Sequence, residues 1–171
     1  DGYASGVTGG KGGKICMVTT TEDYLIIEDT VVVDDSTTEV QTNALVAPGS
    51  LRECAMLDTS AWILFEKRGT YNLQRPIRIA SNKTIDGSGR NIRSTGMGIL
   101  TDLDSNLIFE NLTFSDPSIT TLDTTSRRSV SIHNETHHVW IDHCTFEKYP
   151  LIEVAIKRGS YNVTLYWSRF E

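Results

Sequence analysis

The sequence is poor in the features that mark several classes of protein. It has three cysteines and four prolines among 171 residues. No apolar run approaches the roughly 18 residues of a membrane-spanning helix. The net charge of -6 disfavours binding to nucleic acid or to an anionic membrane. A basic and apolar leader is also missing, which fits a mature secreted protein or a cytosolic one. The remaining composition, 39% hydrophobic and 22% charged, is typical of one soluble domain with a sizeable core.

The cysteines do not form a metal-binding pattern. Cys16, Cys54 and Cys144 include neither a C-x-x-C pair nor a cluster with zinc spacing. A Cys16–Cys54 disulfide is compatible with this count and would leave Cys144 as a free thiol. The chain also carries more N-x-S/T sequons than chance predicts, which indicates a secreted glycoprotein. These sequons begin at Asn82, Asn111, Asn134 and Asn162.

An internal repeat organises the second half of the chain. Three nine-residue segments align without gaps, and they cover residues 106–114, 138–146 and 162–170. A weaker copy begins at Asn82, so that the starts lie 24, 32 and 24 residues apart. Each full copy has apolar second and fourth positions, then a two-residue jog and a closing Phe. This alternation of period two, broken by a bend, predicts two short strands that meet at a corner.

The repeat predicts a parallel coil in which each turn stacks on the previous one. Two further strands, 130–132 and 154–156, precede the last two copies and again lie 24 residues apart. Asn or His at the start of each copy suits a turn with left-handed backbone conformation. We expect Phe114, Phe146 and Phe170 to stack inside the coil. We also expect Cys144 to be a buried structural thiol, because it occupies an inward position of the repeat.

The first 60 residues lack this repeat and predict a different organisation. The Gly-rich segment 1–14 does not match a phosphate-binding loop, so we interpret it as an entry strap. Residues 28–44 are acidic and Thr-rich and predict an exposed insertion. Ser50 and Glu53 have capping-box spacing, which predicts a short helix that covers the open end of the coil. The strands are expected from Ala61 onward. Residues 1–171 are expected to form one domain, in which residues 1–60 lead into the coils of residues 61–171.

Four ordered blocks resemble the pectate lyase family, which includes pectin lyases and related pollen allergens. The blocks are the Gly-rich N-terminus and residues 81–89, 139–143 and 157–164. The resemblance implies an all-β, right-handed parallel β-helix, apparently truncated at its C-terminal turns. It also implies a secreted, extracellular protein that acts as a monomer. The implied activity is Ca²⁺-dependent β-elimination of polygalacturonate, an acidic plant cell-wall polysaccharide.

The calcium ligands that the resemblance implies are replaced in this chain. The family's acidic ligands fall on Leu151 and Ala155, and a third falls beside Arg127 and Arg128. Alternate residues of a strand point to opposite sides, so Glu153 is expected on the same outer face as Leu151 and Ala155. Asp123 lies in the loop before the arginines and could join Glu153 only if that loop folds back. Glu153 and Asp123 are therefore the best remaining acidic candidates. Ca²⁺ prefers six to eight oxygen ligands, so two carboxylates form a poor site for the expected Ca²⁺.

The remaining candidate site residues are cations that would contact the polysaccharide. Lys157 matches a family lysine that faces the bound polymer, while Arg127 and Arg128 could hold a substrate carboxylate in place of calcium. The arginine that serves the family as base is expected on turns beyond Glu171, so the chain is either a fragment or a natural truncation without a base.

Two functions remain open at this point. The leading prediction is a lyase that acts on pectate or pectin. The alternative is an inactive β-helix relative that binds cell-wall polysaccharide or resembles an allergen. A hydrolase on the same architecture is disfavoured, because the outward positions 129, 131, 153 and 155 carry no paired carboxylates.

Overall fold

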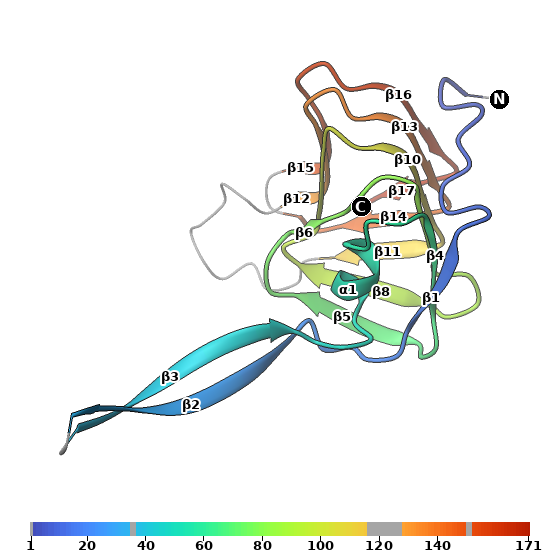
Figure 1. Cartoon of the computed structure of the whole chain (residues 1–171). Helices are drawn as coiled ribbons and strands as arrows, with labels where there is room; N and C mark the ends of the chain where they lie inside the picture. The colour runs from blue at the N-terminus through green and yellow to red at the C-terminus, as the bar shows by residue number, and fades with distance from the viewer. Residues whose placement is uncertain (1, 35–36, 116–127, 150–151) are drawn as a thin grey trace.

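A computed structural model describes residues 2–34, 37–115, 128–149 and 152–171. The expected parallel β-helix is confirmed, and three parallel sheets form its sides (Figure 1). The chain passes from one sheet to the next and returns to the first one turn later. Within the described ranges, no helix is both long enough and apolar enough to cross a membrane.

Each of the three sheets grows by one strand per turn of the coil. The six-stranded sheet contains β1 (Lys14–Val18), β4 (Ala61–Phe65), β7 (Lys83–Asp86), β10 (Ser105–Glu110), β13 (His137–Asp142) and β16 (Tyr161–Tyr166). The five-stranded sheet contains β5 (Gly69–Leu73), β8 (Ile92–Gly96), β11 (Leu112–Ser115), β14 (Thr145–Glu147) and β17 (Arg169–Phe170). The four-stranded sheet contains β6 (Ile77–Arg78), β9 (Ile99–Asp102), β12 (Arg128–His133) and β15 (Ile152–Ile156).

The three copies of the repeat stack in register, as the sequence predicts. Leu107 pairs with Val139, which pairs in turn with Val163 on the next strand. The start of each copy has a positive φ, for example 60° at Asn106 and 55° at His138. Left-handed backbone is costly for most side chains, and Asn tolerates it best after Gly. The Asn of the four sequons also has positive φ, so turn geometry alone accounts for the asparagines there.

Aromatic rings form a continuous column inside the coil. The ring centroids of Phe114 and Phe146 lie 5.3 Å apart, and those of Phe146 and Phe170 lie 5.0 Å apart. Both pairs are stacked nearly parallel, because parallel in-register strands repeat the same side-chain direction at each turn. Cys144 is also buried, at 1% exposed, and its burial raises the pKa of the thiol to about 12. The predicted stack and the predicted buried thiol are both confirmed.

The strands begin earlier than Ala61, contrary to the sequence-based expectation. Strand β1 follows the Gly-rich strap directly and pairs in parallel with β4 along its whole length. Ile15 and Met17 of this strand are exposed and Val18 is buried. The segment lacks a neighbouring copy of the repeat in sequence, so its alternation is short and easily overlooked.

The Gly-rich strap runs across the outer face of the six-stranded sheet. The Asn106 side chain accepts hydrogen bonds from the backbone N–H groups of Thr8 and Gly9, at 2.7 and 2.8 Å. The Gly10 N–H donates to the Thr84 hydroxyl at 3.0 Å. A Cβ on Gly10 would collide with the Ala61 carbonyl, so a residue with a side chain cannot lie this close to the sheet. The Gly-rich segment therefore lies directly against the sheet.

The expected insertion is a long antiparallel hairpin. Strands β2 (Tyr24–Asp34) and β3 (Thr37–Val46) pair with each other and extend away from the coil (Figure 1). Near the start of β2, Ile26 is 65% exposed, and near the end of β3, Leu45 is 54% exposed. The coil therefore does not cover this part of the hairpin.

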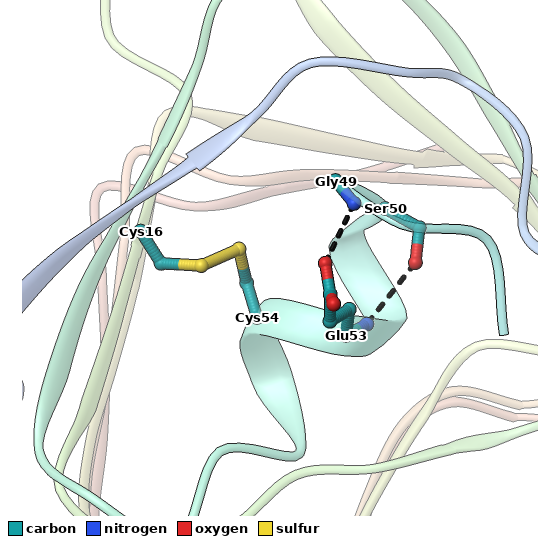
Figure 2. The surroundings of a disulfide bond; sticks show 5 residues. All are labelled: Cys16, Gly49, Ser50, Glu53 and Cys54. Atoms are coloured by element: carbon teal, nitrogen blue, oxygen red, sulfur yellow. Dashed lines mark hydrogen bonds between the residues drawn. A yellow bond between two sulfur atoms is a disulfide. The ribbon is translucent and has the colours of Figure 1, made fainter.

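Helix α1 (Leu51–Ala55) lies at one end of the coil (Figure 1). Ser50 accepts a hydrogen bond from the Glu53 N–H at 3.1 Å, and the Glu53 carboxylate accepts one from the Gly49 N–H at 2.6 Å. Figure 2 shows this capping arrangement beside a disulfide between Cys16 and Cys54, which ties β1 to the helix. The pairing that the cysteine count allowed is therefore present.

Candidate functional site

The candidate site lies on the outer face of the four-stranded sheet. Val130 and Ile132 of β12 point into the core and are fully buried, so the alternate residues Ser129 and Ser131 lie on the outer face. Ser131 pairs with Ala155 of β15 and with Leu100 of β9. Short side chains in the middle of this face leave room for a ligand above the strands.

A cavity of about 210 Å³ lies on this face of the four-stranded sheet. A larger cavity, of about 400 Å³, lies between the N-terminal strap and the six-stranded sheet. The lining of the smaller cavity includes Leu100, Arg128, Ser131 and His133. The Nε atom of Arg128 and the Nε2 atom of His133 are both buried, and neither has a hydrogen-bond partner among the described residues. Buried polar atoms without partners are costly, so these two atoms point to a ligand that would satisfy them.

Positive charge gathers around this cavity. Arg128, Lys157 and Arg158 all act electrostatically on His133, which places them around the same point. None of these three cations forms an ion pair within the described part of the chain. Their combined field favours an anionic ligand, and arginine suits a carboxylate in particular.

The environment of His133 lowers the pKa of its imidazole. Burial is the main cause, and the charges of Lys157, Arg128 and Arg158 lower the pKa further. Asp102 acts in the opposite direction, because a carboxylate stabilises the imidazolium. Burial and the cations prevail, so the imidazole is neutral at neutral pH.

The acidic groups on this face do not form a calcium site. Asp102 accepts hydrogen bonds from Asn134 at 2.6 Å and Arg78 at 3.2 Å, and these interactions lower the pKa of its carboxyl group. Burial raises the pKa of Glu153, which disfavours the ionised form that a metal requires. The described ranges contain no group of three or more His, Cys, Asp or Glu side chains that could hold a metal ion. Ala155, an expected ligand position, offers no side-chain oxygen.

The structure describes only some of the predicted site residues. Arg128, Glu153 and Lys157 belong to adjacent strands or to the turn after them, whereas Arg127, Asp123 and Leu151 lie outside the described residues. His133 and Arg158 belong to this region but were not among the predicted site residues. Strand parity could have placed His133, because it lies two positions beyond Ser131 on the same face.

The described residues thus define an all-β parallel β-helix with a cationic cavity on one outer face. The whole chain, residues 1–171, matches the family model described as pectate lyase, and the chain belongs to this family. A pectate lyase from Nicotiana tabacum is 29% identical over 96% of this chain and 40% of its own length. Pectate lyase 4 from Ambrosia artemisiifolia is 27% identical with the same coverage.

A solved structure shows the same fold. The crystal structure of Jun a 1, the major allergen from cedar pollen, superimposes with a TM-score of 0.72 at 25% identity. The match covers 96% of this chain and 46% of the allergen. The chain therefore spans less than half the length of these relatives.

A column of carboxylates lies on the six-stranded sheet, away from the cationic cavity. Asp86, Glu110 and Asp142 occupy neighbouring strands and pair directly in register. The pKa of Glu110 is raised to about 7, mainly by burial and then by the negative charges of Asp86 and Asp142. Glu110 also lines the cavity of about 400 Å³, together with Trp140 and strap residues 4–7.

This column predicts a pH-dependent stability. The folded-state pKa of Glu110 is about 7 against an ordinary value of 4.5, so the folded protein binds this proton more tightly than the unfolded chain. The contribution of Glu110 to the free energy of unfolding is therefore fully present below pH 4.5 and is lost as the pH rises through about 7. We expect Glu110→Gln to stabilise the protein at pH 8 by ~1–2 kcal/mol, after discounting for screening, and to change little at pH 4.5. Urea unfolding at both pH values measures this difference, and an equal effect at the two values would contradict it.

Proposed function

We propose that this chain is an extracellular lyase that cleaves the α-1,4-linked polygalacturonate of pectate or pectin by β-elimination. The observation that carries the proposal is the cationic cavity on the four-stranded sheet. Arg128 lines it, Lys157 and Arg158 act electrostatically on His133 in its lining, and these three cations form no ion pair among the described residues. Membership of the pectate lyase family supports a lyase, and a polymer with a carboxylate on every sugar complements these charges.

In this proposal, arginine and lysine side chains do the work that calcium would do. The reaction needs a neutralised carboxylate, because neutralisation makes the proton on the adjacent carbon more acidic. The described residues do not fit Ca²⁺, since they contain no group of three or more His, Cys, Asp or Glu side chains that could hold a metal ion, and Ala155 has no side-chain oxygen. Arg128 lines the cavity and can form charge-assisted hydrogen bonds to a carboxylate through its guanidinium group, and Lys157 adds a second positive charge.

The disulfide supports the extracellular location. A Cys16–Cys54 bond persists in oxidising surroundings such as the secretory pathway and the cell exterior. The proposed partner is therefore cell-wall polysaccharide, bound by a single copy of the chain. Glycosylation at the four sequons belongs to the same proposal, and Asn82 and Asn111 are exposed.

The proposal is tested by the ultraviolet absorbance of the unsaturated uronate that β-elimination creates. Incubation of the purified protein with polygalacturonate or methylated pectin should raise the absorbance, and Lys157→Gln should weaken the affinity for saturated oligogalacturonate by roughly tenfold, the value of one charge-assisted contact. No rise with either polymer would reject the lyase. Retained binding without any rise would favour the alternative, a catalytically inactive polysaccharide-binding relative, which the missing calcium ligands among the described residues also favour.

A further inference from the structure

A second pocket adjoins the cationic cavity at the base of the hairpin, and we call it the hairpin pocket. Its lining includes Tyr24, the first residue of β2, Val46, the last residue of β3, and Met56, which follows helix α1. Its volume is about 400 Å³. Pro76 and Leu100 line both the hairpin pocket and the cationic cavity, so the two hollows meet on the outer face of the four-stranded sheet.

The two hollows follow one another along the axis of the coil. Arg78, Leu100 and Ser131 pair in register on the neighbouring strands β6, β9 and β12. Adjacent strands lie about 4.8 Å apart, so these outward side chains form a row along the axis. Arg78 lines the hairpin pocket, Ser131 lines the cationic cavity, and Leu100 lines both. A polymer that places a carboxylate in the cavity can therefore continue into the hairpin pocket.

The hairpin pocket is more apolar than the cationic cavity. Apolar atoms of its lining come from Val46, Met56, Pro76 and Leu100, and Tyr24 adds an aromatic ring. Val46 is 36% exposed and Met56 is 48% exposed, so both side chains present surface that a ligand can cover. Apolar groups of a ligand gain free energy when they leave water for such a surface.

Both arginines in the lining of the hairpin pocket are already paired with carboxylates. Arg52 is buried against Asp23, with 2.7 Å between its Nε and the Asp23 Oδ1. Arg78 forms an ion pair with Asp102 at 3.2 Å. A ligand carboxylate would therefore gain less here than beside the cations of the cavity, which form no ion pair among the described residues. An uncharged, partly apolar ligand group fits this pocket better.

We propose that the hairpin pocket binds a methyl-esterified galacturonosyl unit of the same polymer that places a free carboxylate in the cationic cavity. This inference rests on the proposed lyase function and names its substrate as partly methyl-esterified pectin. The ester replaces the charge of the sugar by a methyl group, and burial of one methyl group strengthens binding by roughly fourfold. Val46 and Met56 then determine the preference for the ester, whereas the cations of the cavity hold the free carboxylate.

The base of the hairpin is anchored at this pocket. The Arg52 guanidinium lies over the Tyr24 ring, 4.6 Å from its centroid, and the same guanidinium pairs with Asp23, the residue before Tyr24. The Asp23 carboxylate also accepts a hydrogen bond from the Gln74 N–H at 2.8 Å. These contacts hold the first residue of the hairpin against the coil. A pocket that is formed in advance avoids the cost of ordering its walls when the polymer binds.

The site is tested by calorimetry with partly methyl-esterified and fully de-esterified oligogalacturonates of equal length. We expect the wild type to bind the partly esterified ligand roughly fourfold more tightly, the value of one buried methyl group. Met56→Lys should abolish or reverse this preference, because the added charge favours a free carboxylate over the ester. Val46→Thr keeps the shape of the side chain but adds a hydroxyl group, and it should reduce the preference to about twofold or less.

Ile15→Lys is the matched control for Met56→Lys. Ile15 is 65% exposed on β1 of the six-stranded sheet, so the variant adds the same charge on a different sheet. Met56 is 48% exposed and caps the C-terminal end of helix α1, where a lysine is compatible with the fold. The control should keep the wild-type preference for the ester.

The outcomes distinguish this inference from the function on which it rests. Equal affinity of the wild type for the two ligands, or tighter binding of the de-esterified one, would overturn the ester site. The lyase would then stand or fall separately, on the formation of unsaturated uronate. Equal shifts in Met56→Lys and Ile15→Lys would also overturn the site. A wild-type dimer that Met56→Lys dissociates in sedimentation, with the ligand preference unchanged, would make the pocket an interface between copies instead. A wild type that prefers the ester but forms no unsaturated product would overturn the lyase and support the site.

Discussion

Arg52→Met is expected to lower the free energy of unfolding by about 3–5 kcal/mol, the range for removing one partner of a buried ion pair. Arg52 and Asp23 are 3% and 2% exposed, and their side chains form two hydrogen bonds, at 2.7 and 2.8 Å. The Arg52 guanidinium also donates to the carbonyl groups of Arg75 and Pro76. The substitution would leave the Asp23 carboxylate buried without its counter-charge, which accounts for the size of the effect.

The pair matters because it joins three separate parts of the chain. Asp23 lies at the base of the hairpin, Arg52 lies in α1, and the Asp23 carboxylate accepts a hydrogen bond from the Gln74 N–H in the turn before β6. Urea unfolding followed by circular dichroism measures the loss. Arg78→Met is the matched control, because the Arg78–Asp102 pair is exposed and such pairs contribute about 0–1 kcal/mol. Equal losses in the two variants would contradict the role given to burial.

Phe146→Ala is expected to cost about 3–5 kcal/mol, as large-to-small substitutions of buried aromatic residues do. The Phe146 ring is fully buried and stacks on Phe114 on one side and on Phe170 on the other. The backbone on both sides is held by parallel pairing, so the coil cannot collapse into the space left by the ring.

Phe170→Ala is the control for this substitution. Phe170 is 50% exposed and has a stacked ring on one side only within the described residues, so its loss should cost roughly half as much or less. Thermal or urea unfolding compares the two variants. Losses of equal size would show that the column does not stabilise the coil through burial.

The repeat made most of the coil predictable, because its periodicity and its register are the same physical feature. Residues at equal positions in segments 106–114, 138–146 and 162–170 pair directly on adjacent strands. The capping helix was predictable for a local reason, since Ser50 and Glu53 satisfy backbone N–H groups within one turn. Strand β1 was not predicted, because its pairing partner lies 47 residues away and no copy of the repeat marks it.

The site was less predictable than the fold. Strand parity placed Glu153 and Lys157 in the sequence analysis, and the resemblance indicated the loss of calcium ligands. The position of His133 in the cavity lining depends on how neighbouring strands and turns pack together, and a linear sequence does not show that packing. The buried Arg52–Asp23 pair was missed for the same reason, since its partners lie 29 residues apart and on different elements.

The central claim is that cations of the four-stranded sheet hold the substrate carboxylate without calcium. The most direct measurement is the affinity of the protein for saturated trigalacturonate, determined by calorimetry in excess EDTA and again in excess Ca²⁺. We expect the two dissociation constants to agree within about twofold, because Arg128 and Lys157 need no metal to bind a carboxylate. Binding that weakens roughly tenfold or more in EDTA would show that a calcium ion holds the substrate and would contradict the account.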